Sequence, residues 1–488
     1  MSLTSPVFLL FLCATALVHY LLPKQYRNAF LLVASLIFYL WAVPEFGAAV
    51  VFTVVFSYFA AIGIGKRSGK ERKIWTAVSV CAVLALLFVF KYLDFFTDTV
   101  VSLLSVFGLS AEPGRLGLAV PAGISFYTFQ TVGYLADVSS GKTEPETNFI
   151  DYALFVTFFP AILSGPIGRA GELLPQYKKP REFRYENIRI GCQRILTGAF
   201  RKIVLADGIG LLVSRLYTDI PERSGAELIA AFLLYGLQIY CDFAGYTEIA
   251  VGTARILGIG LRENFNVPYA GTDLGDFWSR WHMSLTSWLR DYIYIPLGGN
   301  RRGKGRKLLN ILIVFLVSGI WHGAALRYIL WGLIHAVLRI TEEILPALKG
   351  RPADKAAVRW LKRIKVYVVA SFAFIFFRLD LDEAVTAIRR MFTALKPGGF
   401  SGAFLSAASL DIASTFFWYA FYLGTLAASL LLMTVLDHRI VKTGNLNPLE
   451  TFSTVPRWIA IFFMEASVIL FYILTSGSGA VNFIYFGY

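Results

Sequence analysis

Apolar windows long enough to cross a membrane recur from one end of this 488-residue chain to the other. Hydrophobic residues make up 56% of the sequence and charged residues only 16%, against roughly 25% charged residues in an average soluble protein. Because no soluble core could bury so much apolar surface, the sequence predicts an all-helical, polytopic integral membrane protein. The net charge of +14 is expected from basic cytoplasmic loops in a protein embedded in the lipid bilayer, so we expect no nucleic acid as a partner.

The expected membrane spans fall into two sets. Long apolar spans are expected at 2–23, 28–43, 46–65, 74–90, 116–136, 152–168, 228–257, 412–436 and 458–475. Shorter or more polar candidates occupy 99–110, 188–213, 308–326, 328–338 and 366–377. Together they predict about eleven transmembrane helices, with re-entrant or interfacial helices between them.

The basic loops predict the orientation of the chain in the membrane. Lysine and arginine gather in the loops at 24–27 and 66–73, and also at 178–189, 301–307 and 349–365. Since basic loops stay in the cytoplasm, the N-terminus is expected outside it. The apolar halves at 308–326 and 328–338 must then cross the membrane twice, or dip in and return.

Histidine is scarce, and two of the five histidines occur in matching Trp-His doublets. Trp321-His322 lies within an apolar stretch, in the string Ser318-Gly-Ile-Trp-His-Gly-Ala-Ala325, whose small residues permit close approach of backbone or ligand. An ionisable side chain inside a membrane is costly, which favours a functional role over that of a hydrogen-bonded core histidine. Histidine is also the commonest general base, so we predict that His322 is catalytic. His19, His335 and His438 lack such a setting and are predicted to be structural.

The second doublet, Trp281-His282, falls in an expected interfacial amphipathic helix over residues 275–294. Trp278 borders the aromatic face of this helix, Arg280 lies on the polar face, and His282 lies at the edge between them. There the imidazole would look into a half-dry cavity, and Trp278 and Arg280 become candidates for substrate binding. The alternative is a simple aromatic anchor at the membrane interface.

A stripe of polar side chains crosses the apolar span at 228–257. Gln238, Asp242 and Tyr246 are four residues apart and project from one side of a helix. Since they cannot all face lipid, they either line a substrate tunnel or form a hydrogen-bonded cluster between helices. The four cysteines lie far apart, and no pair of metal ligands or nucleotide-binding loop occurs, so we expect no metal site and no permanently bound cofactor.

Several longer strings form an ordered set that is densest between residues 120 and 335. They are Gly123-Ile-Ser-Phe-Tyr-Thr-Phe-Gln130, Phe159-Pro-Ala-Ile-Leu-Ser-Gly-Pro-Ile-Gly-Arg169, Asp242-Phe-Ala-Gly-Tyr-Thr-Glu248, Phe277-Trp-Ser-Arg-Trp-His282, Trp288-Leu-Arg-Asp-Tyr-Ile-Tyr-Ile-Pro-Leu-Gly-Gly-Asn-Arg301 and Ser318-Gly-Ile-Trp-His-Gly323. The set resembles the membrane-bound O-acyltransferase family, and its Ile-Pro-Leu-Gly-Gly-Asn-Arg string resembles the bacterial alginate O-acetyltransferase branch more than the teichoic-acid D-alanyl branch. Ala244 and Glu248 replace the Ser and Asp often found in that branch, a conservative departure.

The resemblance implies a ring of helices around a thinned membrane centre, with a central funnel where a cytoplasmic thioester meets an acceptor from the other face. His322 matches the family's essential histidine, and His282 matches its second histidine position, which implies a supporting role in binding or orientation. Residues 116–345 would then form the catalytic core, between N-terminal transmembrane helices at 1–115 and C-terminal transmembrane helices at 346–475. The location implied is the inner, or cytoplasmic, membrane of a bacterial cell.

The segment at 476–488 is an aromatic C-terminal tail that ends in Tyr488. It resembles the C-terminal motif of the small membrane peptide that works with the D-alanyl branch. We therefore consider the hypothesis that Tyr488 enters the funnel and is transiently acylated as a catalytic relay. An interfacial aromatic anchor is the alternative.

The predicted reaction moves an acetyl group from acetyl-CoA, or from an acylated carrier protein, toward hydroxyls of an extracytoplasmic polysaccharide. His322 would take the proton of the attacking hydroxyl, and Trp321, Asn300 and His282 are candidate hydrogen-bond donors to the oxyanion. The resemblance also implies a secreted or membrane-anchored acetyltransferase as partner. D-alanyl transfer and transfer to a lipid or protein hydroxyl stay open, and a transporter or flippase is the competing class, although no inverted repeat supports it.

Overall fold

A computed structural model describes residues 1–109, 112, 114–351, 354–394 and 412–476. Over these ranges the chain is helical and contains no β-strand. Six described helices are long and apolar enough to cross a membrane: Pro44–Gly65, Gly69–Lys91, Gly225–Ile256, Gly303–His322, Ala420–Thr443 and Thr454–Leu474. The predicted all-helical class is confirmed, whereas the count of about eleven spans stays a prediction.

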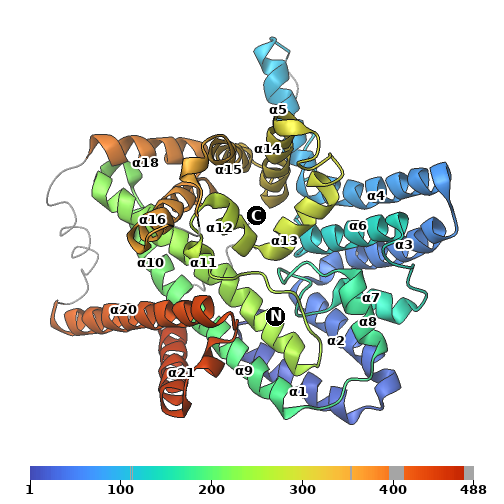
Figure 1. Cartoon of the computed structure of the whole chain (residues 1–488), viewed down its shortest axis with the longest axis horizontal. Coiled ribbons are helices and arrows are strands. Elements are labelled where there is room, and N and C mark those ends of the chain that lie inside the picture. The colour runs from blue at the N-terminus through green and yellow to red at the C-terminus, as the bar shows by residue number, and fades with distance from the viewer. Residues whose placement is uncertain (110–111, 113, 352–353, 395–411, 477–488) are drawn as a thin grey trace.

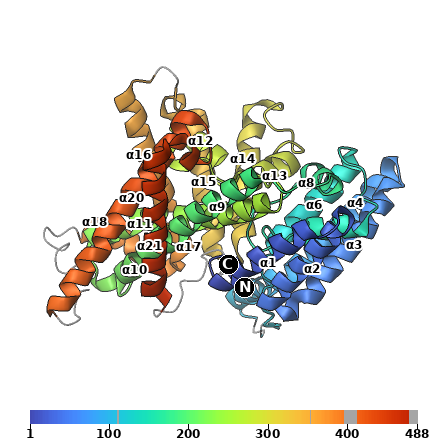
Figure 2. The ribbon, with the colours of Figure 1, turned by 90° about the horizontal axis from the view of Figure 1, so that it is seen from below.

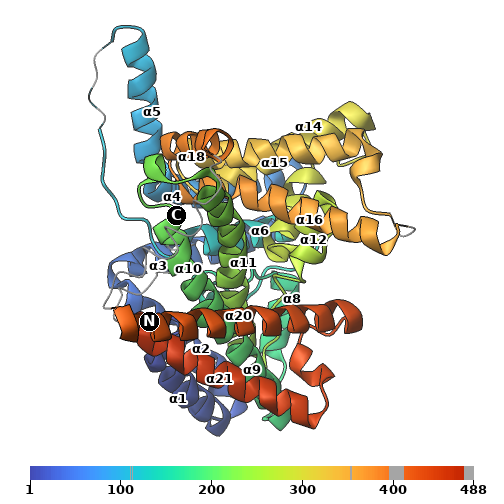
Figure 3. The same ribbon diagram turned by 90° about the vertical axis from the view of Figure 1, so that its left-hand side faces the viewer.

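The N-terminal helices form one side of the molecule. They are α1 (Pro6–Leu21), α2 (Arg27–Ala42), α3 (Gly47–Gly65), α4 (Gly69–Lys91), α5 (Leu93–Val106), α6 (Ile124–Ser140), α7 (Phe149–Thr157) and α8 (Ala170–Lys178). Helices α3, α4 and α6 pack together, and α2 packs on α7 (Figure 1). Helix α5 projects from this block, as Figures 1 and 3 both show.

The predicted span at 116–136 is wrong in its first part. Residues 116–120 are exposed and not helical, and α6 begins at Ile124. The turn before it contains Pro121 and Gly123, and Gly123 has a φ of 77°. A Cβ there would also come within 3.2 Å of the backbone of Leu163, so this close approach requires glycine. The apolar character of 116–120 therefore does not indicate a helix.

The predicted span at 152–168 is also corrected. Helix α7 ends at Thr157, and residues 158–169 continue as buried turns. Two prolines in this stretch cannot donate helical hydrogen bonds. Side chains from other helices supply the missing partners, because Ser35 Oγ accepts the Phe159 N–H at 3.1 Å and Gln130 Oε1 accepts the Gly168 N–H at 3.2 Å. The irregular backbone of residues 158–169 is thus enclosed by other parts of the protein.

A long central helix connects the two sides of the molecule. The elements here are α9 (Tyr185–Ala199), the π-helix Phe200–Ala206, α10 (Asp207–Leu216) and α11 (Gly225–Ile256). The side chains of Ser224 and Glu227 form a capping box that starts α11. Helices α9 and α11 cross at glycines, since a Cβ on Gly198 would lie 2.6 Å from Gly245 O and a Cβ on Gly252 would lie 2.6 Å from Gly191 O.

The expected single amphipathic helix at 275–294 is broken into three pieces. These are α12 (Leu274–Arg280), α13 (Met283–Leu289) and a π-helical turn, Arg290–Tyr294. Backbone hydrogen bonds to an adjacent loop cause the break, because Asn266 N donates to Arg280 O and Met283 N donates to Asn264 O. A helical wheel drawn through the whole stretch therefore does not describe the environment of His282. In Figure 1 these short helices lie near the middle of the molecule, with longer helices around them.

The region at 308–338 forms a helical hairpin, which agrees with two crossings or a dip and return. Helix α14 (Gly303–His322) ends at His322, and α15 (Leu326–Ile344) follows after three residues. Glu343, near the end of α15, accepts from Lys307 and lies 2.9 Å from Lys349 Nζ. The two basic clusters at the base of the hairpin therefore lie together.

The C-terminal helices form the opposite edge of the molecule. They are α16 (Ala356–Ala373), α17 (Ile375–Arg378), α18 (Leu381–Thr393), α20 (Ile412–Thr443) and α21 (Thr454–Ser476). Figure 2 shows α20 and α21 at one edge and α1 to α4 at the other. The aromatic tail with Tyr488 lies outside the described residues.

Two predicted cytoplasmic segments come together at one face of the molecule. Lys24, in the loop after α1, pairs with Glu182 at 3.3 Å, within the cluster at 178–189. Lys178 of the same cluster lies 2.7 Å from Glu146 in the loop after α6. These contacts agree with the prediction that the basic segments share one side of the membrane.

Candidate active site

His322 ends α14 in a dry aromatic environment. Its side chain is buried, and its ring centroid lies 5.0 Å from that of Trp331 and 5.0 Å from that of Phe377. Trp331 reaches this position because α15 packs closely on α14 at Gly319 and Gly332, where an added Cβ would collide with the backbone of the other helix. The hairpin therefore holds an aromatic wall against the predicted base.

Helix α4 holds the carbonyl end of α14 in place. Lys91 Nζ donates to Trp321 O at 2.8 Å and to His322 O at 3.2 Å, and Tyr92 Oη donates to Ile320 O at 2.8 Å. The last carbonyls of a helix have no partner within it and carry partial negative charge, so a lysine from another helix is a fitting cap. Lys91 also lies 3.1 Å from Ser125 Oγ on α6. The backbone of the Trp321-His322 doublet is thereby fixed from outside its own helix.

His282 occupies the break between α12 and α13. Its backbone is left-handed, with φ of 44° and ψ of 53°, and its side chain is buried. Asn264 Oδ1 lies 3.1 Å from His282 Nδ1 and accepts the Ser284 N–H at 3.2 Å. Because a backbone N–H can only donate, the facing atom of Asn264 is its oxygen, and His282 Nδ1 must carry the proton.

This hydrogen bond determines what His282 can do. Burial lowers the pKa of His282 to about 3, so its ring is neutral near pH 7. With the proton on Nδ1, the lone pair lies on Nε2, which accepts hydrogen bonds. In this tautomer Nε2 accepts and does not donate, which argues against the oxyanion donor that the sequence suggested. The supporting role of His282 in binding or orientation stays a prediction.

Trp321 lies between the two histidines. Its ring centroid is 4.9 Å from that of His322 and 5.7 Å from that of His282. Phe126 of α6 completes the contact, with its ring centroid 5.3 Å from that of Trp321. Residues from the sequence strings around 123–130, 277–282 and 318–323 therefore meet at one place. The structure brings His322, His282 and Trp321 together.

Indole N–H groups near the histidines are buried without an acceptor. Among the described residues, Nε1 of Trp321, Trp331 and Trp278 makes no hydrogen bond. Trp278 contacts Trp331, with ring centroids 5.7 Å apart. Buried donors are ordinarily satisfied, so unsatisfied donors beside a histidine suit a substrate carbonyl or an oxyanion. The site can combine a base with hydrogen-bond donors where water is scarce.

The polar stripe of α11 behaves as an interhelical cluster at Asp242. Its carboxylate lies 2.6 Å from Lys202 Nζ of the π-helix, and Lys202 also lies 2.7 Å from Asp207. Gln238 packs against Gly210 of α10, where a Cβ would lie 2.6 Å from its Nε2. Both Gln238 and Tyr246 are buried. Of the two open interpretations, the structure favours the cluster for Asp242 over the lining of a tunnel.

Two further candidates, Asn300 and Arg280, have other surroundings. Asn300 is exposed in the turn that precedes α14, and the adjacent Gly299 O accepts from Asn310, which lies 12 residues, or about 18 Å along the helix, before His322. Arg280 pairs with Asp276 at 2.6 Å and donates to Asn266 O at 3.3 Å. The expected role of Asn300 as an oxyanion donor stays a prediction, and Arg280 is occupied by local partners.

Sequence reasoning missed three residues of this region. Lys91 follows directly on the apolar run at 74–90, where a lysine is ordinarily a flank that reaches for water. Asn264 lies in a loop with no motif of its own. His335 was predicted to be structural, yet within the described chain neither of its ring nitrogens has a hydrogen-bond partner. Its ring centroid lies 4.9 Å from that of Trp331, whose ring also contacts His322 at 5.0 Å. Only Lys91 carried a sequence signal, namely a charge at the end of a span.

Comparison with known proteins agrees with this geometry. The model of the membrane-bound O-acyltransferase family matches residues 139–378, which include both Trp-His doublets. The chain is 36% identical to the probable alginate O-acetylase AlgI of Pseudomonas putida over 76% of this chain and 76% of that protein. It is 32% identical to the peptidoglycan O-acetyltransferase of Helicobacter pylori over 76% and 74% of the two chains. The teichoic acid D-alanyltransferase of Bacillus subtilis is 33% identical over 44% of this chain and 57% of its own.

The resemblance inferred from the sequence strings is therefore confirmed. Relatives with more than 30% identity extend over about three quarters of this chain, and their names describe acyl transfer. The competing prediction of a transporter or flippase is not supported. This chain belongs to the membrane-bound O-acyltransferase family and is a multi-pass membrane acyltransferase.

Proposed function

We propose that this enzyme transfers an acetyl group from a cytoplasmic thioester toward hydroxyls of an extracytoplasmic polysaccharide. The observation that carries the proposal is the position of His322, which lies against buried indole groups beside a second, neutral histidine. Two relatives named for O-acetylation cover about three quarters of the chain, whereas the D-alanyltransferase covers 44% of it. This difference favours acetyl transfer over D-alanyl transfer.

In the proposed mechanism His322 acts as the general base. It takes the proton from an acceptor hydroxyl as the oxygen attacks the thioester carbonyl, and N–H donors such as that of Trp321 stabilise the oxyanion. The carbon–sulfur bond then breaks, and the leaving thiolate recovers the proton from the His322 imidazolium. The products are an ester and a free thiol. His282, as an acceptor through Nε2, would orient the attacking hydroxyl.

The proposed direction of acyl transfer across the membrane follows from the basic loops. The positive-inside rule gives a cytoplasmic side for the segments at 24–27 and 178–189, with the N-terminus outside and the chain in the bacterial inner membrane. The thioester donor, acetyl-CoA or an acylated carrier protein, would approach from that side. The acceptor polysaccharide and an acetyltransferase partner would lie on the other. A transient acyl group on Tyr488 would connect the two, as a relay that stays a hypothesis.

Acetyl transfer by the purified enzyme tests the proposal. The protein is placed in nanodiscs with radiolabelled acetyl-CoA, and thioester consumption and protein-bound label are measured for wild type, His322→Gln and Tyr488→Phe. We expect loss of consumption in His322→Gln, and loss of bound label in Tyr488→Phe if the relay operates. His438→Gln is the matched control, because His438 is an exposed histidine on α20.

Each remaining outcome changes the proposal in a defined way. Full turnover in His322→Gln would overturn the assignment of the base. Label that persists in Tyr488→Phe would remove the relay and leave direct transfer from the thioester. Consumption of a D-alanyl carrier thioester, with none of acetyl-CoA, would replace acetyl transfer by D-alanyl transfer.

A further inference from the structure

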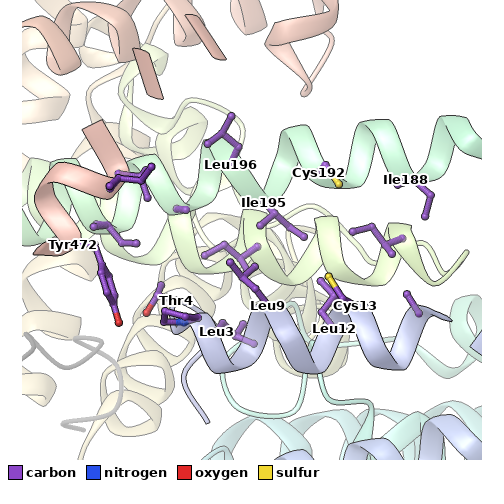
Figure 4. A pocket seen from close by; sticks show the side chains of 18 of the residues that line it. Leu3, Thr4, Leu9, Leu12, Cys13, Ile188, Cys192, Ile195, Leu196 and Tyr472 are labelled. Atoms are coloured by element: carbon purple, nitrogen blue, oxygen red, sulfur yellow. The ribbon is translucent and has the colours of Figure 1, made fainter. Parts of the chain in front are cut away.

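A long apolar cavity opens between α1, α9, α11 and α21, away from the two Trp-His doublets. It has a volume of about 550 Å³, and its walls are almost entirely aliphatic. Figure 4 shows side chains from these helices converging on it, with Cys13 of α1 opposite Cys192 of α9. None of the lining residues belongs to the candidate active site. This cavity is therefore separate from the candidate active site.

The shape of the cavity matches an extended hydrocarbon chain. Its lining on α1 runs from Pro6 to Ala16, a rise of about 15 Å along the helix, and Leu3 and Thr4 extend it before the helix begins. That helical length is about half of the roughly 30 Å hydrocarbon core of a bilayer. Neighbouring apolar side chains such as Leu10 and Ile473 are exposed to the surroundings of the protein, 72% and 65% respectively. The apolar lining of the cavity is thus continuous with an exposed apolar surface, as expected for a surface that faces lipid.

A basic pocket of about 340 Å³ adjoins one end of this cavity. The two pockets meet at consecutive residues, because Asn187 lines the basic pocket and Ile188 the apolar one, and Arg255 and Ile256 repeat this division on α11. The cationic side chains of the basic pocket are Lys179, Arg181, Arg184 and Arg255. An apolar groove therefore leads directly into a cluster of positive charge.

None of these four cations forms an ion pair with a carboxylate within the described part of the chain. Arg184 and Arg255 are also exposed, whereas Arg181 is buried and donates to Asn28. The one carboxylate of the pocket, Glu182, pairs with Lys24 at 3.3 Å. The flanking Phe183 is 62% exposed, as an aromatic side chain at a membrane interface would be. The pocket therefore offers unneutralised positive charge at headgroup level.

We propose that the two pockets together bind one anionic phospholipid, with an acyl chain in the apolar cavity and the headgroup phosphate at Arg184 and Arg255. Basic pockets between helices at the cytoplasmic side of a membrane are suited to such headgroups. The pantetheine arm of acetyl-CoA fits less well, because its amides would lie unpaired against aliphatic walls. The site is separate from the catalytic centre and does not depend on the identity of the acyl donor.

Native mass spectrometry of the delipidated full-length protein tests this proposal. Phosphatidylglycerol, phosphatidylcholine, inorganic phosphate and acetyl-CoA are titrated separately. We expect one tightly retained phosphatidylglycerol, weaker binding of phosphatidylcholine, and no displacement of the lipid by inorganic phosphate. Displacement by acetyl-CoA at equal concentration would overturn the proposal and assign the basic pocket to the donor. Equal retention of both lipids would overturn the role of the arginines.

Two pairs of variants separate the headgroup from the acyl chain. Arg184→Ala/Arg255→Ala is expected to weaken phosphatidylglycerol binding about 30-fold, since each basic residue near an anionic headgroup contributes about fivefold. Lys70→Ala/Lys73→Ala removes the same charge from exposed positions on α4 and should leave binding unchanged.

Cys192→Phe fills the cavity, whereas Cys81→Phe places the same ring on the exposed surface of α4. Only Cys192→Phe should abolish retention of the lipid. Unchanged retention in both Cys192→Phe and the double arginine variant would show that the lipid binds elsewhere.

Discussion

The two Trp-His doublets share a sequence but not a structure. Trp321-His322 ends a 20-residue helix, and a lysine from another helix binds its carbonyl oxygens. Trp281-His282 lies where two short helices break, with His282 in a left-handed conformation and its ring held by Asn264. In the first doublet the backbone is fixed, and in the second the imidazole is fixed.

This difference indicates separate roles for the two histidines. A ring held through Nδ1 keeps one tautomer and one orientation, which suits the binding and orientation of a hydroxyl. A histidine whose backbone is fixed from another helix, and whose ring lies against Trp331 and Phe377, is positioned for proton transfer, in which both ring forms are used in turn. The comparison therefore supports the proposal that His322 carries out the chemical step and His282 the orienting step.

Replacement of His322 should have the largest effect on activity. A general base contributes about 10²- to 10⁴-fold to the rate, so His322→Gln should lower kcat by that factor. The measurement is initial-rate acetyl-CoA consumption in nanodiscs. His282→Gln, assayed in parallel, should retain more activity than His322→Gln. If the order of the two variants were reversed, the roles assigned to the doublets would have to be exchanged.

Lys91→Met should have the next largest effect, and should act on the first doublet alone. It leaves the carbonyls of Trp321 and His322 without their donor and frees the end of α14 to shift. A displacement of about 1 Å can cost 10²-fold in rate, so we expect kcat to fall about 10- to 100-fold.

Lys73→Met is the matched control, an exposed lysine at the other end of the same helix. It should leave kcat unchanged. A Lys91→Met enzyme with wild-type kcat would show that the cap does not position His322.

The sequence predicted the first doublet well because its environment is mostly local. The apolar run at 308–326, the small residues around it and a lone histidine are enough to predict a hairpin with a buried imidazole. The hydrogen bonds from Lys91 to the end of α14 could not be predicted from the sequence, because Lys91 and Trp321 are 230 positions apart. A charge at the end of an apolar span usually contacts water or headgroups, and only the tertiary structure shows that Lys91 turns inward.

The second doublet was predicted poorly because its environment is not local. A helical wheel through 275–294 assumes one continuous helix, whereas backbone hydrogen bonds from residues 264–266 interrupt it at His282. Asn300 illustrates a related point, since a shared sequence string at 288–301 does not imply a shared site. The ordered sequence strings predicted the family correctly. They did not predict equally well which residues surround each side chain in the folded protein.

Asn264→Ala tests the hydrogen bond that holds the His282 ring in the second doublet. Loss of the Asn264 oxygen leaves the His282 ring free to change tautomer and removes the partner of Ser284. A lost buried hydrogen bond costs about 1 to 3 kcal/mol, so we expect a fall in kcat/KM of about tenfold.

Asn266→Ala is the control in the same loop, because the contacts of Asn266 with Arg280 are made by its backbone. The pH profile for the proton transfer at His322 should keep its shape in both variants. A changed profile in Asn264→Ala would mean that His282, and not His322, titrates during catalysis.

The smallest expected effect concerns stability and pH. Burial lowers the pKa of His282 from an ordinary value of 6.5 to about 3. Between these two values the unfolded chain binds a proton at His282 that the folded protein does not, so His282 makes the folded state less stable as the pH falls through that window. His282→Asn tolerates the left-handed backbone and removes the titrating group. Its thermal midpoint should therefore decline less than that of wild type between pH 7.5 and pH 5, by about 2 °C, whereas the exposed His438→Asn should follow wild type. Equal slopes for all three proteins would mean that His282 is protonated in the folded state, and the tautomer that distinguishes the second doublet from the first would have to be abandoned.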